Sequence, residues 1–404
     1  MKKHQITAIL FILITACVVC ACATQTGNQD ISTESHSSVE AQGELVDAES
    51  TKADKTEPET IEAESTKAEN TEKETETVKV EPTKPSATEP ESIKQEVAVP
   101  DFTVPEGYES YVLTFAGDCT LGTMPSWMSY QYCFNKVIGN NYNYPFQNVR
   151  KFFVADDCTF INLESVLAES GTPENKQFTF RGPVSYVNIM TGSSVEFANL
   201  ANNHTYDFGQ AGYTSTKQTL ESNNVAYVET NSSTLYTTKS GLKIGVYGVY
   251  FSLDKNDMVA DVTALKNAGA DVIVAAAHWG IELEKVQNST QSSIAHQLID
   301  AGVDIVWGHH PHILQPIEKY NGGITYYSLG NFSFGGNHNP SDKDTAVIQQ
   351  QVLRDAEGKV MLGELKVIPC SISTLTDRND FRPTPYAVGS EAYNRVFKKL
   401  KCTQ

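Results

Sequence analysis

Positive charge is scarce in this chain, which argues against one large class of partners. The 404 residues carry 31 Lys and Arg against 49 Asp and Glu, for a formal net charge of −18. Proteins that bind nucleic acid need a basic surface, so nucleic acid is not expected as a partner. The sequence also has no GxSxG motif and no glycine-rich phosphate loop, two marks of other hydrolase and nucleotide-binding classes.

Cysteine is sparse beyond the N-terminal leader. Of the 8 cysteines, three lie within residues 1–22. The remaining five have an odd count and no CxxC spacing, which argues against a disulfide framework and against zinc held by cysteines. A single pair such as Cys119–Cys133 stays open.

The leader itself predicts export. An apolar run over residues 6–21 follows Lys2 and Lys3, and it is too short and too rich in cysteine for a membrane span. Small residues before a cysteine are typical of a lipoprotein signal, with Cys22 ("VCAC") favoured over Cys17 ("ITAC") because polar sequence follows at once. We therefore expect a signal peptide over residues 1–22 and a lipid anchor at Cys22, on the outer face of a bacterial cell membrane. A signal without lipid is the alternative.

Aromatic and branched apolar residues are rare over the next segment. Residues 24–97 are rich in Thr, Glu, Lys and Pro, and "AESTKA" occurs twice. Such a composition cannot bury enough apolar surface to offset the entropy of ordering the chain. We expect a disordered linker over residues 23–107 and a folded domain over residues 108–404.

The folded part alternates short apolar runs with helical patterns. This alternation predicts an α/β domain with a largely parallel sheet, and a final hairpin over residues 345–369 adds antiparallel strands. The apolar runs lie at residues 111–117, 158–164, 195–204, 243–250, 271–280, 304–312 and 324–332, and the helical patterns at 183–192, 212–224, 262–271 and 290–304.

Polar side chains occur where these predicted strands end. The carboxyl ends of strands form the ligand crevice of open α/β sheets, so we expect these side chains to meet at one sheet edge. Taken alone, the cluster "GHHPH" could be a histidine-rich turn, an acid/base site or a metal site. The convergence with carboxylates favours one or two divalent metal ions, with Mn, Fe or Zn preferred by mixed oxygen and imidazole ligands. The residues concerned are Asp118, Glu164, Asn203, His204, His278, His310 and His312.

The motifs "GD", "NLE", "NNH", "HWG", "GHHPH" and "GNF", in this order, resemble the CapA family of bacterial capsule and poly-gamma-glutamate synthesis proteins. That family is related to the calcineurin-like metallophosphoesterases, and the resemblance covers about residues 111–369. It implies a four-layer αββα sandwich of metallophosphoesterase type. It also implies two metal ions bridged by a carboxylate and a metal-activated water.

The resemblance assigns a role to each residue. Glu164 would be the bridging carboxylate, and His204 would donate a hydrogen bond or a proton to the leaving oxygen. His309 is expected to pack or to support a ligand. Asp118 and His312 would bind the first metal, and Asn203, His278 and His310 the second.

This sequence departs from the phosphoesterase pattern at two positions. Asp118-Cys119-Thr120 stands where an Asp-x-His is usual, and the longer Glu164 replaces an aspartate. The resemblance therefore implies a weaker first metal and puts ordinary phosphatase activity in doubt. We expect an extracytoplasmic, metal-dependent hydrolase-like protein that handles an anionic surface polymer. The alternative is a non-catalytic accessory subunit that binds the polymer or its membrane synthase complex through a residual metal site.

Other polar residues carry two interpretations each. Arg181 in "FRGP" would hold an anionic substrate group, or form a structural salt bridge. Asn331 in "GNF" would orient a ligand, or cap a turn. Glu282, after "HWG", would support His278, or lie in solvent.

Overall fold

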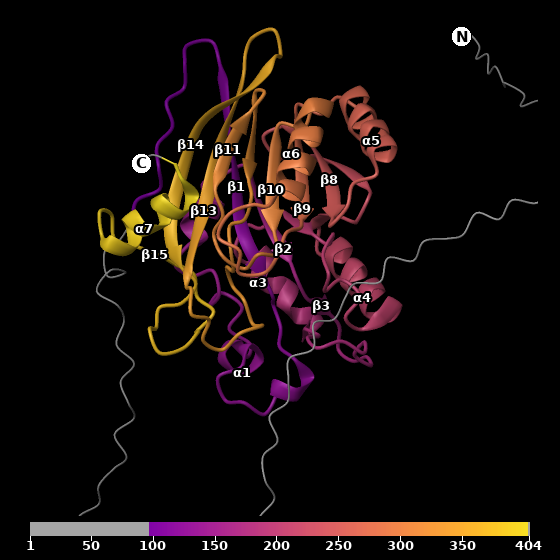
Figure 1. Ribbon diagram of the computed structural model, residues 1–404, viewed down its shortest axis with the longest axis vertical. Helices are drawn as coiled ribbons and strands as arrows, with labels where there is room; N and C mark the ends of the chain where they lie inside the picture. The colour runs from indigo at the N-terminus through magenta and orange to yellow at the C-terminus, as the bar shows by residue number, and fades with distance from the viewer. Residues whose placement is uncertain (1–96, 403–404) are drawn as a thin grey trace, which may run out of the picture. The chain divides into compact units, whose positions relative to one another are not determined.

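A computed structural model describes residues 97–402 of the chain. Its framework is two large mixed sheets (Figure 1). The first has seven strands in the order β15-β14-β13-β1-β2-β5-β6. Within it, β1, β2, β5 and β6 are parallel, and β13, β14 and β15 add antiparallel pairings. The bounds are β1 Glu109–Cys119, β2 Cys158–Leu163, β5 Phe197–Asn199, β6 Ala226–Val228, β13 Asp344–Arg354, β14 Val360–Ser371 and β15 Thr384–Pro385.

The second sheet has six strands in the order β11-β12-β10-β9-β8-β7. Its four central strands are parallel and its two edge strands pair antiparallel. A separate two-stranded sheet pairs β3 (Val166–Leu167) with β4 (Arg181–Gly182). The bounds in the six-stranded sheet are β7 Ser233–Thr237, β8 Lys243–Tyr250, β9 Val272–His278, β10 Ile305–His309, β11 Ile317–Tyr320 and β12 Gly323–Tyr326.

Apolar side chains bind the two sheets together and attach helices to their outer faces. Phe115 and Phe160 from the first sheet pack against Trp307 from the second in the shared core. Alternate positions, such as Ile161 and Ile273, face outward toward the helices, as the period of a strand requires. In Figure 1, α5 and α6 lie beside β8 and β9, whereas α7 lies at the β14 side.

The helices divide between the two faces. Apolar residues of α1 to α4 join the core on the outer face of the seven-stranded sheet, and those of α5 and α6 cover the six-stranded sheet. The last helix, α7, packs on β13 and β14. The bounds are α1 Phe134–Ile138, α2 Arg150–Val154, α3 Val187–Thr191, α4 Gly209–Ser222, α5 Lys255–Asn267, α6 Ser289–Ala301 and α7 Glu391–Leu400, with single 3-10 turns at Pro125–Trp127 and Val184–Tyr186.

The predicted four-layer sandwich is confirmed. The expectation of one largely parallel sheet is wrong in one respect, because the parallel strands are shared between two sheets. Their carboxyl ends nevertheless meet, since β1 and β10 lie next to each other and the Trp307 indole donates a hydrogen bond to the Ala116 carbonyl oxygen (2.9 Å).

The folded unit includes residues that composition assigned to the linker. Val97 and Val99 pack against the outer core of the seven-stranded sheet, and Gln351 donates a side-chain hydrogen bond to the Thr103 carbonyl oxygen (2.9 Å). Cys22 and the rest of the predicted leader lie outside the described residues. All five described cysteines are free, so Cys119 and Cys133 form no disulfide. Within residues 97–402, no helix has the length and apolar character needed to cross a membrane.

Candidate metal centre

The candidate site begins where β1 approaches the turn before Phe332. The amide of Asp118 donates to the Gly330 carbonyl oxygen (2.9 Å), and the amide of Phe332 donates to the Asp118 carbonyl oxygen (2.8 Å). A Cβ atom at Gly117 would clash with the Gly330 carbonyl, so only glycine allows the two backbones to come this close. This approach places the buried side chains of Asp118 and Asn331 next to the same crevice.

A network of buried amides connects β1, β2 and β5 below the site. Asn162 donates to Asp118 Oδ1 (2.9 Å), and its own oxygen accepts from Asn199 (3.0 Å) and Asn202 (3.1 Å). The Asn162 amide nitrogen also lies 3.5 Å from His278 Nδ1, which joins the two sheets. Because buried amides have few alternative partners, this network fixes the position of the Asp118 carboxylate.

The Asp118 carboxylate forms hydrogen bonds with two imidazole rings. His309 Nδ1 lies 2.9 Å from Asp118 Oδ1, and His312 Nδ1 lies 3.1 Å from Asp118 Oδ2. His310 and His312 have left-handed backbone φ angles of 95° and 59°, a conformation seldom adopted by residues other than glycine. The turn containing Pro311 is therefore held in a strained form that directs successive imidazoles toward the crevice.

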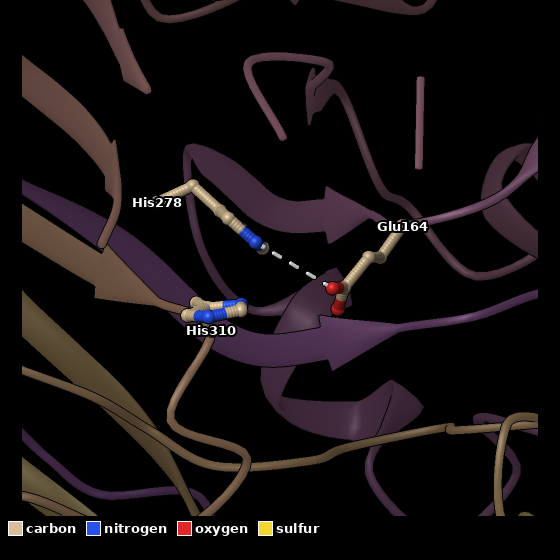
Figure 2. Close-up of side chains that lie close together, drawn as sticks. All are labelled: Glu164, His278 and His310. Carbon is tan, nitrogen blue, oxygen red and sulfur yellow. Dashed lines mark ion pairs between the residues drawn. The ribbon is translucent and has the colours of Figure 1, made fainter. Parts of the chain in front are cut away.

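Glu164 lies at the centre of the site, as a member of two of the candidate ligand sets. The residue is fully buried, and neither side-chain oxygen accepts from any group in residues 97–402. His278 Nε2 lies 3.6 Å from Glu164 Oε1, and this nitrogen likewise bonds to no described residue. Figure 2 shows the His278 and His310 rings beside the Glu164 carboxylate. A carboxylate and an imidazole nitrogen that face each other, each without a hydrogen bond to a described residue, are suited to bind a cation.

His204 forms a pair with Asp207 on the other side of Glu164. His204 Nδ1 lies 2.8 Å from Asp207 Oδ2, and its Nε2 lies 4.0 Å from Glu164 Oε1. The ring packs against Phe180, with centroids 4.6 Å apart. Asp207 also accepts from the Phe180 amide and pairs with Lys176, so it is held from several directions. The second imidazole nitrogen is thereby directed toward the centre of the site.

Three sets of side chains bring their ligand atoms within 4.8 Å of one another. Glu164 belongs to two of them, as a bridging carboxylate would. Asn203 belongs to no such set, but its side-chain oxygen is buried and bonds to none of the described residues, and the residue precedes His204 in the chain. The sets are Glu164–His278–His310, Asp118–Glu164–His312 and Glu282–His310–His312.

Burial and mutual charge shift the pKa values of the candidate ligands, and a cation would oppose the raised pKa values of Glu164 and His312. Burial and the Asp118 charge raise the pKa of Glu164 well above its usual range. Burial and the neighbouring His312 lower the pKa of His310 to about 4. Burial opposes a charged His312, but Glu164 and Asp118 outweigh it and raise its pKa to about 9. A divalent cation would favour the ionised carboxylate and the neutral imidazoles, so the donor set fits a metal.

A cavity of about 210 Å³ opens beside the centre. His204, Glu282, His312 and Asn331 line it together with Phe180 and other apolar residues. Arg181 does not reach this cavity. Its guanidinium lies over the Phe208 ring, 4.8 Å from the centroid, and it lines a different hollow beside β3 and β4.

Sequence reasoning missed two residues that organise the site. Asn162 lies in the quoted "NLE" motif, two residues before Glu164, and faces the same way because strand side chains alternate. Asp207 follows His204 by three residues, a spacing that one turn can bring together. Both spacings can be seen in the sequence, but neither shows which side chain Asn162 or Asp207 bonds to.

Residues 112–336 match the family described as bacterial capsule synthesis protein PGA_cap. The chain belongs to this family. The predicted resemblance to CapA proteins is therefore confirmed, and the matched residues of this PGA_cap chain include every candidate ligand named above.

Curated relatives of this PGA_cap chain include two CapA proteins. It is similar to the PGA biosynthesis protein CapA of Bacillus subtilis, with 28% identity over 63% of this chain and 70% of the relative. It is also similar to the capsule biosynthesis protein CapA of Bacillus anthracis, with 26% identity over 72% and 73%. A probable polyglutamine synthesis accessory protein of Mycobacterium tuberculosis is 27% identical over 55% and 67%.

Among solved structures, the chain aligns with the Haemophilus influenzae NAD nucleotidase NadN at 10% identity and a TM-score of 0.35. That alignment covers 73% of this chain and 56% of the nucleotidase. The Thermus thermophilus sulfate thiohydrolase SoxB aligns at 10% identity and a TM-score of 0.38, covering 74% of this chain and 61% of SoxB.

Proposed function

We propose that this protein is a metal-dependent hydrolase-like protein that acts on an anionic surface polymer, such as poly-gamma-glutamate, or on its precursors during capsule synthesis. The reaction class is attack of water on a phosphoester or amide-type centre. Membership of the capsule synthesis family supports the polymer as the target. The leader sequence supports a place outside the cytoplasm, lipid-anchored at Cys22 on the outer face of the membrane.

The observation that carries the proposal is the Glu164 carboxylate. It is completely buried among imidazoles, yet it forms no hydrogen bond with the described part of the chain. Leaving a buried carboxylate without a partner costs several kcal/mol, on the order of the penalty for desolvating an ion. A carboxylate with a purely structural role would have a hydrogen-bond partner, whereas a carboxylate that binds a metal ion keeps its oxygen atoms free for the metal.

Each side chain has a definite task at such a centre. Asp118, Glu164, Asn203, His278, His310 and His312 would hold one or two cations of Mn, Fe or Zn. A bound cation supplies Lewis acidity at this point. Asp118 also orients His309 and His312, because it accepts a hydrogen bond from each ring. His204, oriented by Asp207, would deliver a proton to the leaving group, and Asn331 would position the substrate at the cavity wall.

Metal content and turnover test this function together. The purified full chain should contain one or two equivalents of transition metal by elemental analysis, and should hydrolyse model phosphodiesters or gamma-glutamyl peptides. His204→Ala should lower turnover by about 10²- to 10⁴-fold and leave metal content unchanged. Asp101→Asn, an exposed carboxylate far from the site in sequence, is the matched control and should behave as wild type.

The second candidate is an accessory subunit without turnover. Thr120 favours it, because this buried residue stands where an imidazole is usual and its hydroxyl donates to the Glu164 carbonyl oxygen (3.1 Å). If metal binds but His204→Ala changes no measurable reaction, the accessory function is supported and the hydrolase is not.

A further inference from the structure

Glu282 is the third carboxylate within reach of the candidate ligands, and nothing in the family resemblance gives it a role. It lies four residues after the end of β9, in the connection to α6, and is exposed. One of its side-chain oxygens nevertheless lies within 4.8 Å of nitrogen atoms of His310 and His312. It also lines the cavity that opens beside the centre.

Hydrogen bonds hold the backbone segment that carries this carboxylate. Leu283, the next residue, has a left-handed φ of 63° and donates its amide to the Pro311 carbonyl oxygen (2.9 Å). Gln315 donates a side-chain hydrogen bond to the Glu284 carbonyl oxygen (2.9 Å) and is itself bonded by Gln291 of α6 (2.9 Å). The segment carrying Glu282 is thus attached directly to the turn that carries the imidazoles.

Each pair of the three ligand sets has one residue in common. Glu164 joins the His278 set to the Asp118 set, His310 joins the His278 set to the Glu282 set, and His312 joins the Glu282 set to the Asp118 set. The Glu282 carboxylate could therefore bind a metal ion near His312 from the side of the cavity that both residues line. Carboxylate oxygen beside imidazole nitrogen is a common ligand combination for Mn, Fe and Zn.

The same side of the centre lacks one donor, because Thr120, directly after β1, stands where a histidine is usual in the Asp-x-His pattern. Thr120 is buried and its hydroxyl donates to the Glu164 carbonyl oxygen (3.1 Å), so this position supplies no imidazole nitrogen. We propose that Glu282 supplies a carboxylate in place of this donor and binds a cation together with His310 and His312, on the open side of the centre. The inference rests on the proposed metal-dependent function and adds a solvent-side ligand to it.

Metal affinity of the full chain tests the assignment without any substrate. Glu282→Gln removes the charge with almost no change of shape, and Glu284→Gln is the matched control two residues away in the same connection. Mn²⁺ and Zn²⁺ affinities come from competition titration with a chelating dye, stoichiometry from elemental analysis, and ligand geometry from the visible absorption of the Co²⁺ form. We expect Glu282→Gln to weaken the last metal equivalent by at least about tenfold and to change the Co²⁺ spectrum.

Wild type and Glu284→Gln should give the same affinities and spectrum. If Glu282→Gln matches them as well, Glu282 is no ligand and this inference is overturned, while the metal-dependent function stands. If wild type itself binds no metal, the proposed function falls and the inference with it.

Discussion

At the scale of single residues, the His204–Asp207 pair bears on the choice between the proposed hydrolase and the accessory subunit. An ionised carboxylate only accepts hydrogen bonds, so His204 Nδ1 donates to Asp207 and Nε2 faces Glu164. No ligand set contains His204. An imidazole oriented toward a metal centre without belonging to its ligands is placed to transfer a proton.

Asp207→Asn should separate this orienting role from the folding of the site. We expect turnover to fall by about a hundredfold or more, because the amide no longer fixes the tautomer that leaves Nε2 free. Metal stoichiometry should not change, since Asp207 is no ligand in any of the three sets. A variant that loses metal and activity in parallel would show that Asp207 only supports the fold.

The sequence indicated several residues that the structure brings together, namely Asp118, Glu164, His278, His310 and His312, but not how they pair. Strand ends followed by Asp, Glu, Asn or His were visible without a structure. The bond between Asp118 and His309 spans 191 positions and depends on how two sheets pack. Local composition carries no information about that packing, and so Asp118 was expected to bind metal but not to orient two imidazoles.

At the scale of elements, long apolar strands and periodic helices were predictable, and short or charged ones were not. β8, β9, α4 and α6 follow their apolar patterns closely. The edge strand β7 has a mixed, partly exposed sequence, and its conformation is set by hydrogen bonds to β8. The helix α7 is highly charged, and its small apolar face has a partner only once β13 and β14 are folded.

The attachment of α7 depends on a buried carboxylate. Asp344 on β13 is 4% exposed, and Arg395 of α7 donates to both of its oxygens at 2.7 Å, while Lys399 pairs with it at 2.7 Å. Burial opposes ionisation, but hydrogen bonds from Arg395 and Lys399 hold the pKa of Asp344 below its usual value. The apolar face of α7, with Val396 and Leu400, is thereby held against the core between the sheets.

Asp344→Asn should lower the free energy of unfolding by about 1–3 kcal/mol at pH 7, less than for a fully buried pair because the Arg395 side chain is 46% exposed. Because the folded state lowers the pKa of Asp344, its carboxylate stabilises the fold at pH values above about 4, the pKa of an aspartate in the unfolded chain. This stabilisation is lost as the pH falls through the pKa of Asp344 in the folded state. Urea unfolding from pH 7 to pH 3 should therefore show a smaller acid-induced loss in the variant. Asp342→Asn, at a half-exposed partner of Lys399, is the control. Equal pH dependence in Asp344→Asn and wild type would contradict this account.

At the scale of the whole molecule, the candidate metal centre also lies at a junction between the two sheets. Asp118 and Glu164 come from the ends of β1 and β2, whereas His278, His310 and His312 come from β9 and from the turn after β10. A cation held by both groups would link the halves of the sandwich. Its binding energy would then appear as stability of the entire fold, because the unfolded chain has no such site.

Metal removal should therefore lower the melting temperature of the wild-type chain. At a free metal concentration of about 100 times Kd the linkage amounts to about 2.7 kcal/mol, which corresponds to about 5 °C for a domain of this size. Glu164→Gln should abolish this shift, because it removes the carboxylate common to two ligand sets.

The same substitution should raise the melting temperature of the metal-free protein, since it removes a buried carboxylate without a hydrogen bond from residues 97–402, at a gain of about 1–3 kcal/mol. The two effects have opposite signs, so scanning calorimetry with and without a chelator distinguishes a metal ligand from a structural carboxylate. Glu357→Gln, in the exposed turn between β13 and β14, should change neither value. A Glu164→Gln protein that melts lower than wild type even without metal would show that the carboxylate stabilises the fold by itself, and the case for a metal centre would lose its main support.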